Sequence, residues 1–372
     1  MRALNARDIR RLRMQNQWLT PRHDATAAEV VQHMGALQAQ EIWSGHWSIA
    51  SRSTGLDLED IHKATLDRQI LRTWPMRGTI HFVPAADARW MLRATEATAF
   101  TGVERRRDFL GLSEADAFAA VEVLRDALSH GKAVTRTECL NILDDAGLMK
   151  DRSHAYHLLW FASQHGATCI GPQEGKEQTF VNLDKWVPTH NDLSLDEALA
   201  ELACRYFDSH GPSDRKELVR WTGLPVAMVR QAIEAAGDRL APVDTELGEM
   251  LVSTRVAERL DGSEIDPPEK SRSVLLLSGF DEYMLGYGDR STMMTKEQTK
   301  LVVPGSNGMF RPTVVDDGVV VGIWRRTVKK TRVDIAVAPF GDLNARQRKG
   351  VERAAAEFGE FIGLEAHVIV EG

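Results

Sequence analysis

The pattern of apolar and polar positions repeats one order of elements three times along the chain. Residues 26–83 predict helices followed by two short strands, which flank Pro75-Met76-Arg77-Gly78. Residues 133–181 and 196–252 each predict helices followed by a further pair of strand-like runs. Apolar residues spaced three and four apart indicate helices, and short β-branched runs between turn signals indicate strands. Because helices followed by a hairpin are typical of a winged helix, we expect three such units in tandem.

From about residue 260 the pattern becomes rich in strands. Two valine-rich runs flank Asp316-Asp317-Gly318, and an Asp-Gly pair between such runs predicts a tight hairpin. Residues 301–303 are interpreted as another strand, and residues 344–361 as an amphipathic helix. The predicted fold class is therefore α+β, with three tandem winged-helix units followed by a C-terminal β-barrel-like domain. We place the units at residues 1–100, 101–190 and 191–258, and the C-terminal domain at 259–372.

The composition is that of a globular protein with several domains, since 43% of the 372 residues are hydrophobic and 27% are charged. Cys139, Cys169 and Cys204 are far apart and form no CxxC pair, which argues against a disulfide framework and a cysteine zinc site. The first residues lack an apolar run of signal-peptide length, and no apolar span reaches the roughly 18 residues of a membrane helix. We therefore expect a cytoplasmic protein with no membrane role.

The formal net charge of −7 excludes a protein that binds nucleic acid over its whole surface. Local basic clusters remain at residues 105–107 and at Arg325, Arg326, Lys329 and Lys330. Such runs are usually solvated faces, although they can also contact phosphates. Trp324, beside the second cluster, is either a core residue or an aromatic contact to a nucleic-acid backbone.

Common catalytic motifs are missing from the sequence. It has no HExxH, P-loop or GxGxxG motif, so we expect no metal and no nucleotide cofactor. His154 and His157 have helical spacing, but no third ligand stands near them. No other cofactor is indicated.

Two glutamines separated by one alanine follow the first apolar helix stripe. Val30, Met34 and Leu37 form that stripe, and Gln38 and Gln40 stand where the helix should end. Side chains two positions apart point the same way only in an extended segment. One hypothesis is that the two amides cap the helix end. The other is that they converge on one water molecule.

Four ordered motifs extend over nearly the whole chain. They are residues 37–40 (LQAQ), 74–84 (WPMRGTIHFVP), 280–291 (FDEYMLGYGDRS) and 310–312 (FRP) with 324–326 (WRR). Together they resemble the bacterial winged-helix DNA glycosylases, the AlkZ-like enzymes that excise alkylated purines and unhook interstrand crosslinks. In that family a Gln-x-Gln or Gln-x-Asp pair is the catalytic motif, and Gln38 and Gln40 match the Gln-x-Gln form.

The resemblance implies a concave channel, and a partner that is double-stranded DNA carrying alkylated purines. We expect a monomer. An N7-alkylated guanine is cationic and leaves as a neutral base, so two amide carbonyls that hold a water against the sugar C1′ would suffice without a strong acid. We expect DNA contacts from Arg77, Thr79, Arg290, Arg325, Arg326, Lys329 and Lys330.

The function hypothesis is a monofunctional DNA glycosylase for cationic N-alkylated purines, with interstrand crosslinks as a further substrate class. The alternative is a non-catalytic winged-helix DNA-binding protein, such as a regulator, in which the glutamines only cap a helix. A third class, a protein-interaction scaffold with an acidic surface, would show no salt-sensitive DNA binding.

Overall fold

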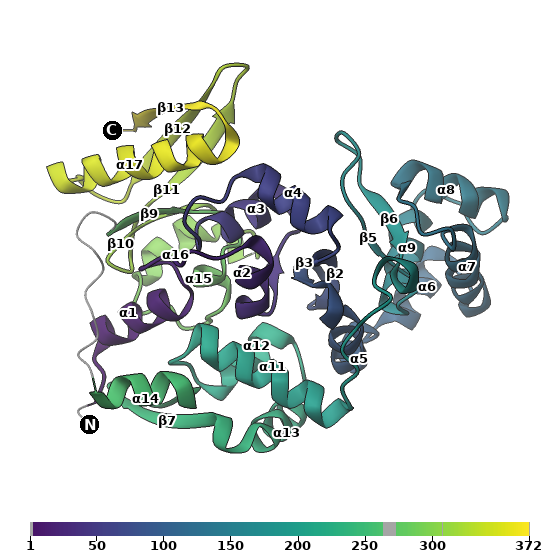
Figure 1. The fold of residues 1–372 in the computed structure, drawn as a ribbon, viewed down its shortest axis with the longest axis horizontal. Coiled ribbons are helices and arrows are strands. Elements are labelled where there is room, and N and C mark those ends of the chain that lie inside the picture. Colours follow the sequence, from purple (N-terminus) through teal and green to yellow (C-terminus); the bar gives the residue numbers. More distant parts are fainter. Residues whose placement is uncertain (1–2, 263–272, 307, 372) are drawn as a thin grey trace.

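The computed structural model describes residues 3–262, 273–306 and 308–371. Figure 1 shows a helical first segment at the centre, a second segment to one side, a third below it and a C-terminal sheet above it. Each of the three helical segments carries a two-stranded hairpin. No helix among the described residues is long and apolar enough to cross a membrane.

The first segment places its helices before a tight hairpin. Its elements are α1 (Ala6–Asn16), α2 (Ala27–Met34), β1 (Leu37–Gln38), α3 (Ile42–Ala50), α4 (Leu58–Leu66), β2 (Ile70–Met76), β3 (Thr79–Pro84), η1 (Ala85–Asp87) and α5 (Ala88–Ala99). Thr26 and Glu29 form a capping box that starts α2. Arg77 and Gly78 have φ values of 55° and 65°, which closes the β2–β3 hairpin in a two-residue loop.

The second segment shares a sheet with the first. Its elements are α6 (Val103–Leu110), α7 (Glu114–Ala127), β4 (Val134–Thr135), α8 (Arg136–Asp145), α9 (His154–Gln164), β5 (Thr168–Ile170), β6 (Thr179–Asn182) and α10 (Leu183–Trp186). Arg72 of β2 pairs with Ile170 of β5, so the two hairpins form one six-stranded sheet in the order β1-β3-β2-β5-β6-β4.

The third segment has its own two-stranded sheet, against which the N-terminal residues pack. Its elements are α11 (Leu195–His210), α12 (Arg215–Thr222), α13 (Val226–Ala236), η2 (Gly237–Arg239), β7 (Leu240–Thr245), β8 (Gly248–Ser253) and α14 (Thr254–Gly262). Leu4 forms a β-bridge with Thr245, and Ile9 and Leu12 share a small core with Val252. The chain start therefore packs on the third segment.

The C-terminal part is an open five-stranded sheet in the order β13-β12-β11-β10-β9. Its elements are β9 (Val274–Leu277), α15 (Glu282–Leu285), α16 (Lys296–Val302), η4 (Pro304–Ser306), β10 (Thr313–Asp316), β11 (Val319–Val328), β12 (Arg332–Pro339), α17 (Ala345–Ile362) and β13 (Glu365–Val370). β9 and β13 remain edge strands within the described residues, so the sheet is half of a barrel. The mixed α+β class is confirmed. The C-terminal domain, predicted to be barrel-like, has a sheet that does not close.

The structure differs from the sequence-based expectation at residues 301–303. Leu301 and Val302 end helix α16 and form no strand, because a capping box between Thr295 and Gln298 starts a helix just before them. Trp324 is a core residue: it is 3% exposed, and its indole N–H donates to the carbonyl oxygen of Leu277 at 2.8 Å. It therefore does not face a nucleic acid.

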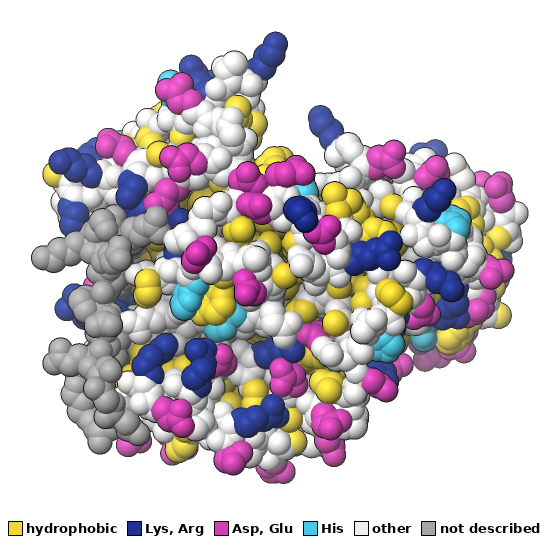
Figure 2. Space-filling view, in the orientation of Figure 1, with side chains coloured by type: hydrophobic (Ala, Val, Ile, Leu, Met, Phe, Trp, Pro, Cys, Tyr) yellow, Lys and Arg dark blue, Asp and Glu magenta, His cyan; other side chains and the backbone are white. Residues whose placement is uncertain are grey.

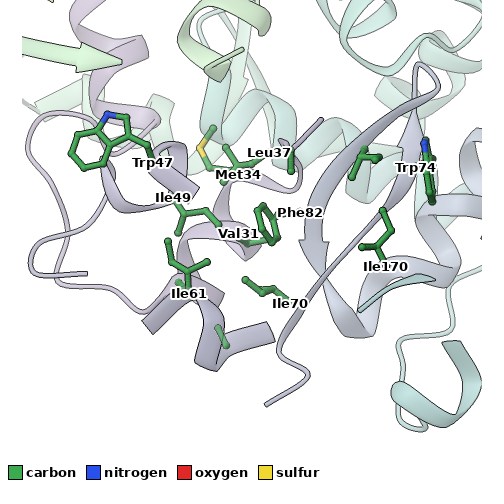
Figure 3. Close-up of a cluster of buried hydrophobic side chains, with 14 of the residues drawn as sticks. Val31, Met34, Leu37, Trp47, Ile49, Ile61, Ile70, Trp74, Phe82 and Ile170 are labelled. Atoms are coloured by element: carbon green, nitrogen blue, oxygen red, sulfur yellow. The ribbon is translucent and has the colours of Figure 1, made fainter. Parts of the chain in front are cut away.

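Two apolar cores lie on the two faces of the β1-β3-β2 strands. Figure 3 shows Leu37 and Phe82 packed with Val31 and Ile70 in the first core, which also reaches the second and C-terminal segments. The second core joins these strands and α5 to α11, α12 and α13. Because both faces are covered, the strands that carry the glutamine motif are held firmly.

A buried ion pair connects the end of α3 to the start of α15. Arg52 and Asp281 are both fully buried and are joined by hydrogen bonds of 2.9 and 3.0 Å. Asp281 also accepts the hydroxyl of Ser48 at 3.0 Å, and Arg52 donates to Oε1 of Gln17 at 2.9 Å. The first segment and the C-terminal part are thereby fixed to one another.

We expect Asp281→Asn to lower the free energy of unfolding by about 3 kcal/mol or more, because the Arg52 charge would stay buried without its counter-charge. The control is Asp67→Asn, which removes an exposed pair with Lys63 and should change the free energy by less than about 1 kcal/mol. Urea denaturation followed by circular dichroism measures both variants. Equal, small losses would contradict a structural role for the buried pair.

Candidate active site

The segment that carries the two glutamines is extended and held against β3. α2 ends at Met34, and β1 then runs antiparallel to β3 with Gln38 opposite His81. The N–H of Ala39 continues the ladder by donating to the carbonyl oxygen of Ile80 at 2.7 Å. The helix has thus ended before the motif begins, and the hypothesis that the two amides cap it is wrong.

Alternation along this strand separates apolar from polar side chains. Leu37 and Ala39 belong to the apolar core with Phe82, and Leu37 is seen there in Figure 3. Gln38 therefore points to the opposite face, which it shares with its cross-strand partner His81. The extended geometry needed for a paired-amide site is present at Gln38.

The two amides have different surroundings. Gln40 is exposed, and its Oε1 accepts the backbone N–H of Ile80 at 3.1 Å, which fixes the side chain and leaves one acceptor position on the oxygen. Gln38 is only 7% exposed, yet neither of its amide atoms is sealed from solvent or hydrogen-bonded to a described residue. Gln38 thus offers a free amide at a largely covered position.

His81, the strand partner of Gln38, is fully buried and neutral. Its Nδ1 lies 2.8 Å from the carbonyl oxygen of Thr79, and its Nε2 lies 3.1 Å from a guanidinium nitrogen of Arg77. The guanidinium can only donate, so Nε2 accepts and Nδ1 carries the proton. Burial, together with the charge of Arg77, lowers the pKa of His81 to about 3. The imidazole is therefore an uncharged, fixed neighbour of the motif.

A buried carboxylate from α15 belongs to the same cluster. Glu282 accepts the indole N–H of Trp221 at 2.9 Å and lies 3.4 Å from Nε2 of His210, while its Oε1 has no hydrogen-bond partner among the described residues. Burial raises the pKa of Glu282, but His210 and the charge of Arg77 outweigh burial and hold that pKa at about 2. The first, third and C-terminal parts of the chain therefore meet beside the motif.

Glu41, the residue after the motif, connects it to the C-terminal sheet. Its carboxylate caps α3 by accepting the N–H groups of Trp43 and Ser44. Arg326 of β11 lies 3.3 Å from the same carboxylate. Arg326 is therefore engaged with the segment that carries the glutamines.

Two more of the residues expected to contact DNA are engaged within the protein, and the hydroxyl of a third is buried. Arg77 bonds to His81, and the Thr79 hydroxyl oxygen is buried without a partner among the described residues. Arg290 donates to the carbonyl oxygen of Met284 at 2.7 Å and lies over a phenylalanine ring at 4.9 Å. The structure brings Arg77 and Thr79 to the glutamine motif, whereas Arg290 makes no hydrogen bond or ion pair with Gln38 or Gln40.

The remaining predicted contacts lie on the β11–β12 hairpin, which projects from the C-terminal sheet in Figure 1. Arg325 is exposed and pairs with Glu371 at 2.6 Å, and Lys329 pairs with Asp334 at 2.5 Å. Lys330 is exposed and forms no ion pair with a described residue. This hairpin is the exposed basic element among the predicted contacts.

Sequence reasoning did not select His81, Glu282 or Glu41. A signal existed for two of them: His81 has strand spacing from Thr79, and Glu41 stands three residues before Ser44, as an N-cap does. Glu282 stands in the motif at residues 280–291, but the sequence did not reveal its partners, which come from distant parts of the chain. Among the described residues no group of three or more His, Cys, Asp or Glu side chains could hold a metal ion.

This chain is similar in sequence to known DNA glycosylases. The family described as DNA glycosylase AlkZ-like matches residues 31–361. The chain belongs to the AlkZ-like DNA glycosylase family. One member, the interstrand DNA cross-link repair glycosylase of Streptomyces sahachiroi, is 26% identical over 373 residues, which cover 95% of each protein.

The fold of the AlkZ-like family is also seen directly in a solved structure. The Streptomyces sahachiroi DNA glycosylase AlkZ matches this chain with a TM-score of 0.82 and 26% identity. The match covers 99% of this chain and 100% of that one. The likeness in fold therefore extends over the segment that carries the two glutamines, the third segment and the C-terminal sheet.

The low pKa of His81 predicts an acid-sensitive contribution to the stability of this AlkZ-like protein. In the unfolded chain histidine has a pKa of about 6.5. Because the folded-state pKa is lower, about 3, the contribution is complete above pH 6.5 and is lost as the pH falls toward 3. Between about pH 4 and 6, His81→Gln should reduce the slope of unfolding free energy against pH by roughly 1.4 kcal/mol per unit.

The exposed His190 provides the matched control for this measurement, since His190→Gln should leave the slope unchanged. Urea titrations at four or more pH values give the slope for each variant. An unaltered slope in His81→Gln would show that the imidazole already carries a proton in the folded state.

Proposed function

We propose that this chain is a monofunctional DNA glycosylase that hydrolyses the N-glycosidic bond of cationic N-alkylated purines in duplex DNA, with interstrand crosslinks as a further substrate. The observation that carries the proposal is the amide of Gln38, which has no hydrogen-bond partner among the described residues and is not sealed from solvent. It lies on a strand packed on both faces, two residues before Gln40, whose side-chain carbonyl is fixed by the Ile80 N–H. This motif occurs in a chain of the AlkZ-like family, whose relative repairs interstrand DNA cross-links.

In the proposed reaction the bond between the sugar C1′ and the base nitrogen breaks, and its electron pair neutralises the cationic base. A water oxygen then bonds to C1′, and the water loses a proton to solvent. The carbonyl oxygens of Gln38 and Gln40 hold this water and stabilise the positive charge that develops on the sugar. No general acid is needed, because the base leaves in its neutral form.

We further propose that residues 1–100, 101–190 and 191–258 are winged-helix units that bind the duplex together with the half-barrel at 259–372. The β11–β12 hairpin supports this proposal, because it carries exposed basic residues at Arg325 of β11 and at Lys330 in its turn. The alternative of a non-catalytic regulator assigned the glutamines to a helix cap. That assignment fails, since α2 ends at Met34 and Gln40 bonds to β3.

Removing the Gln38 amide tests the proposal. We expect Gln38→Ala to slow excision of N7-methylguanine in a single-turnover assay by roughly 10²- to 10³-fold, as for the loss of one charge-stabilising group. Gln40→Ala should slow the reaction too and also loosen β1, because Oε1 caps the Ile80 N–H. Gln32→Ala, at an exposed position of α2, is the control and should react like the wild type. Wild-type rates in both motif variants would overturn the proposal.

The pH profile is a second test of the amide mechanism. Amides do not titrate near neutrality, His81 stays neutral with a pKa of about 3, and Glu282 stays ionised with a pKa of about 2. We therefore expect the single-turnover rate of the wild type to be nearly flat between about pH 6 and 9. Rates measured on duplex with N7-methylguanine at saturating enzyme check this. A bell-shaped profile in that range would mean that a titrating acid or base takes part.

A further inference from the structure

A separate pocket of about 380 Å³ lies between the first and second segments. α3, α4, β2, β3 and the loop at residues 171–175 all contribute to its walls. Figure 1 shows the β5–β6 hairpin, which carries this loop, rising beside α4. Figure 2 shows the surface hollowed on this side of the molecule, between the C-terminal sheet and the second segment.

This pocket is distinct from the glutamine site. Arg72 and Phe82 of its wall are cross-strand partners, and Phe82 shares the apolar face of the strands with Leu37. Gln38 and His81 point to the other face. The strands β1, β3 and β2 therefore separate the pocket from the proposed catalytic amides.

Arg72 is a buried arginine without a counter-charge. Its exposed fraction is 6%, and it makes no hydrogen bond or ion pair with any side chain in the described part of the protein. Its guanidinium nitrogens are not sealed from solvent, so they reach the pocket. Burial lowers the pKa of Arg72 to about 10, which leaves the group charged at neutral pH. Buried arginines are normally paired, so this one lacks an anion.

Two histidines add polar groups beside Arg72. His46 is 4% exposed; its Nδ1 is enclosed without a hydrogen-bond partner among the described residues, whereas its Nε2 is not sealed from solvent and is the nitrogen that can reach the pocket. The ring of His62 lies edge-on to it, with centroids 5.3 Å apart. Burial, then the charges of His62 and Arg72, lower the pKa of His46 to about 3, so its imidazole is neutral. Glu59 is the one carboxylate of the pocket lining, and its residue is exposed.

The loop at residues 171–175 closes the pocket through a close backbone approach. A Cβ atom at Gly171 would lie 2.8 Å from the Thr179 hydroxyl and 2.9 Å from Val181, so only glycine lets the loop pack here. The ring of Phe82 and the loop supply apolar wall around the basic groups. The pocket is therefore preformed, enclosed on several sides and electropositive at its base.

We propose that this pocket binds a phosphate group, with the Arg72 guanidinium donating two hydrogen bonds and the His46 and His62 imidazoles donating one each. A doubly charged oxyanion with several acceptor oxygens matches these donors, and the planar guanidinium suits bidentate contact. The phosphate comes either from the DNA backbone or from a free phosphoester. The proposal does not depend on the glycosidic chemistry assigned to Gln38.

The first measurement is binding of inorganic phosphate by isothermal titration calorimetry, in chloride buffer of matched ionic strength. We expect saturable binding by the wild type and a loss of about tenfold or more in affinity for Arg72→Met. Arg152→Met, which removes an exposed arginine outside the pocket, is the control and should bind like the wild type. Arg72→Lys keeps the charge and removes the bidentate geometry, so it should fold and bind phosphate more weakly. No saturable binding by the wild type, or equal binding by all four proteins, overturns the proposal.

A second measurement identifies the source of the phosphate. If a DNA phosphate occupies the pocket, Arg72→Met weakens binding of an undamaged duplex and lowers the salt slope of that binding by about one. If a free phosphoester occupies it, duplex binding is unchanged while binding of inorganic phosphate is lost. Both measurements use undamaged or no DNA, so failure of the excision assay with Gln38→Ala leaves their outcome unaffected.

Discussion

The antiparallel pairing of β1 with β3 is the interaction on which the site depends. β1 is only two residues long, and a strand of that length has no stability of its own. It persists because Leu37 belongs to the apolar core on one face and Ala36 to the core on the other. A slip of one residue would carry Leu37 out of its core and drive the Gln38 amide into it, which costs the desolvation of an unpaired polar group. Register therefore decides which face the glutamine motif presents.

Buried charges hold the segments in fixed relation to this strand. Arg52 and Asp281 join α3 to α15, and Glu282, one residue later, lies in the cluster of Arg77 and His81. Burying such charges costs free energy of desolvation, and apolar residues of similar volume would often stabilise a fold equally well. Their contribution is directional, since each bond fixes one orientation between segments that are distant in sequence. That orientation keeps Gln38 beside a neutral imidazole, which itself accepts a hydrogen bond from Arg77.

Local features could be predicted from the sequence because their causes lie within a few residues. The Asp-Gly pair at Asp317 and Gly318 does form the predicted β10–β11 turn. Thr135 and Glu138, spaced three residues apart in the sequence, likewise form the capping box that starts α8. The Gln-x-Gln motif was found from a short pattern in the same way. The strand predicted at residues 301–303 was wrong, because a run of three apolar residues is too short to show a strand or helix period. The capping box just before the run starts a helix instead.

The partners of charged residues could not be predicted, because they are set by the tertiary structure. Arg326 and Glu41 are 285 positions apart, yet they form an ion pair beside the motif. In the sequence Arg326 and Lys330 are two basic residues of one cluster, and no local pattern distinguishes them. Lys330 nevertheless forms no ion pair among the described residues. Arg72 is the reverse case: a single arginine inside a strand pattern gave no signal, and only the structure shows it buried without a counter-charge.

The two faces of the β1-β3-β2 strands carry different chemistry, and the strands between these faces are rigid. Gln38 lies on one face and the Arg72 pocket on the other, and apolar cores cover the remainder of both. Relay of a signal between two sites requires an element with two arrangements, and a strand packed on both sides is a poor candidate for one. A phosphate held at Arg72 would therefore act by position alone. Where that phosphate belongs to DNA, it would fix the distance of the DNA strand from the Gln38 amide, because the sheet between them is rigid.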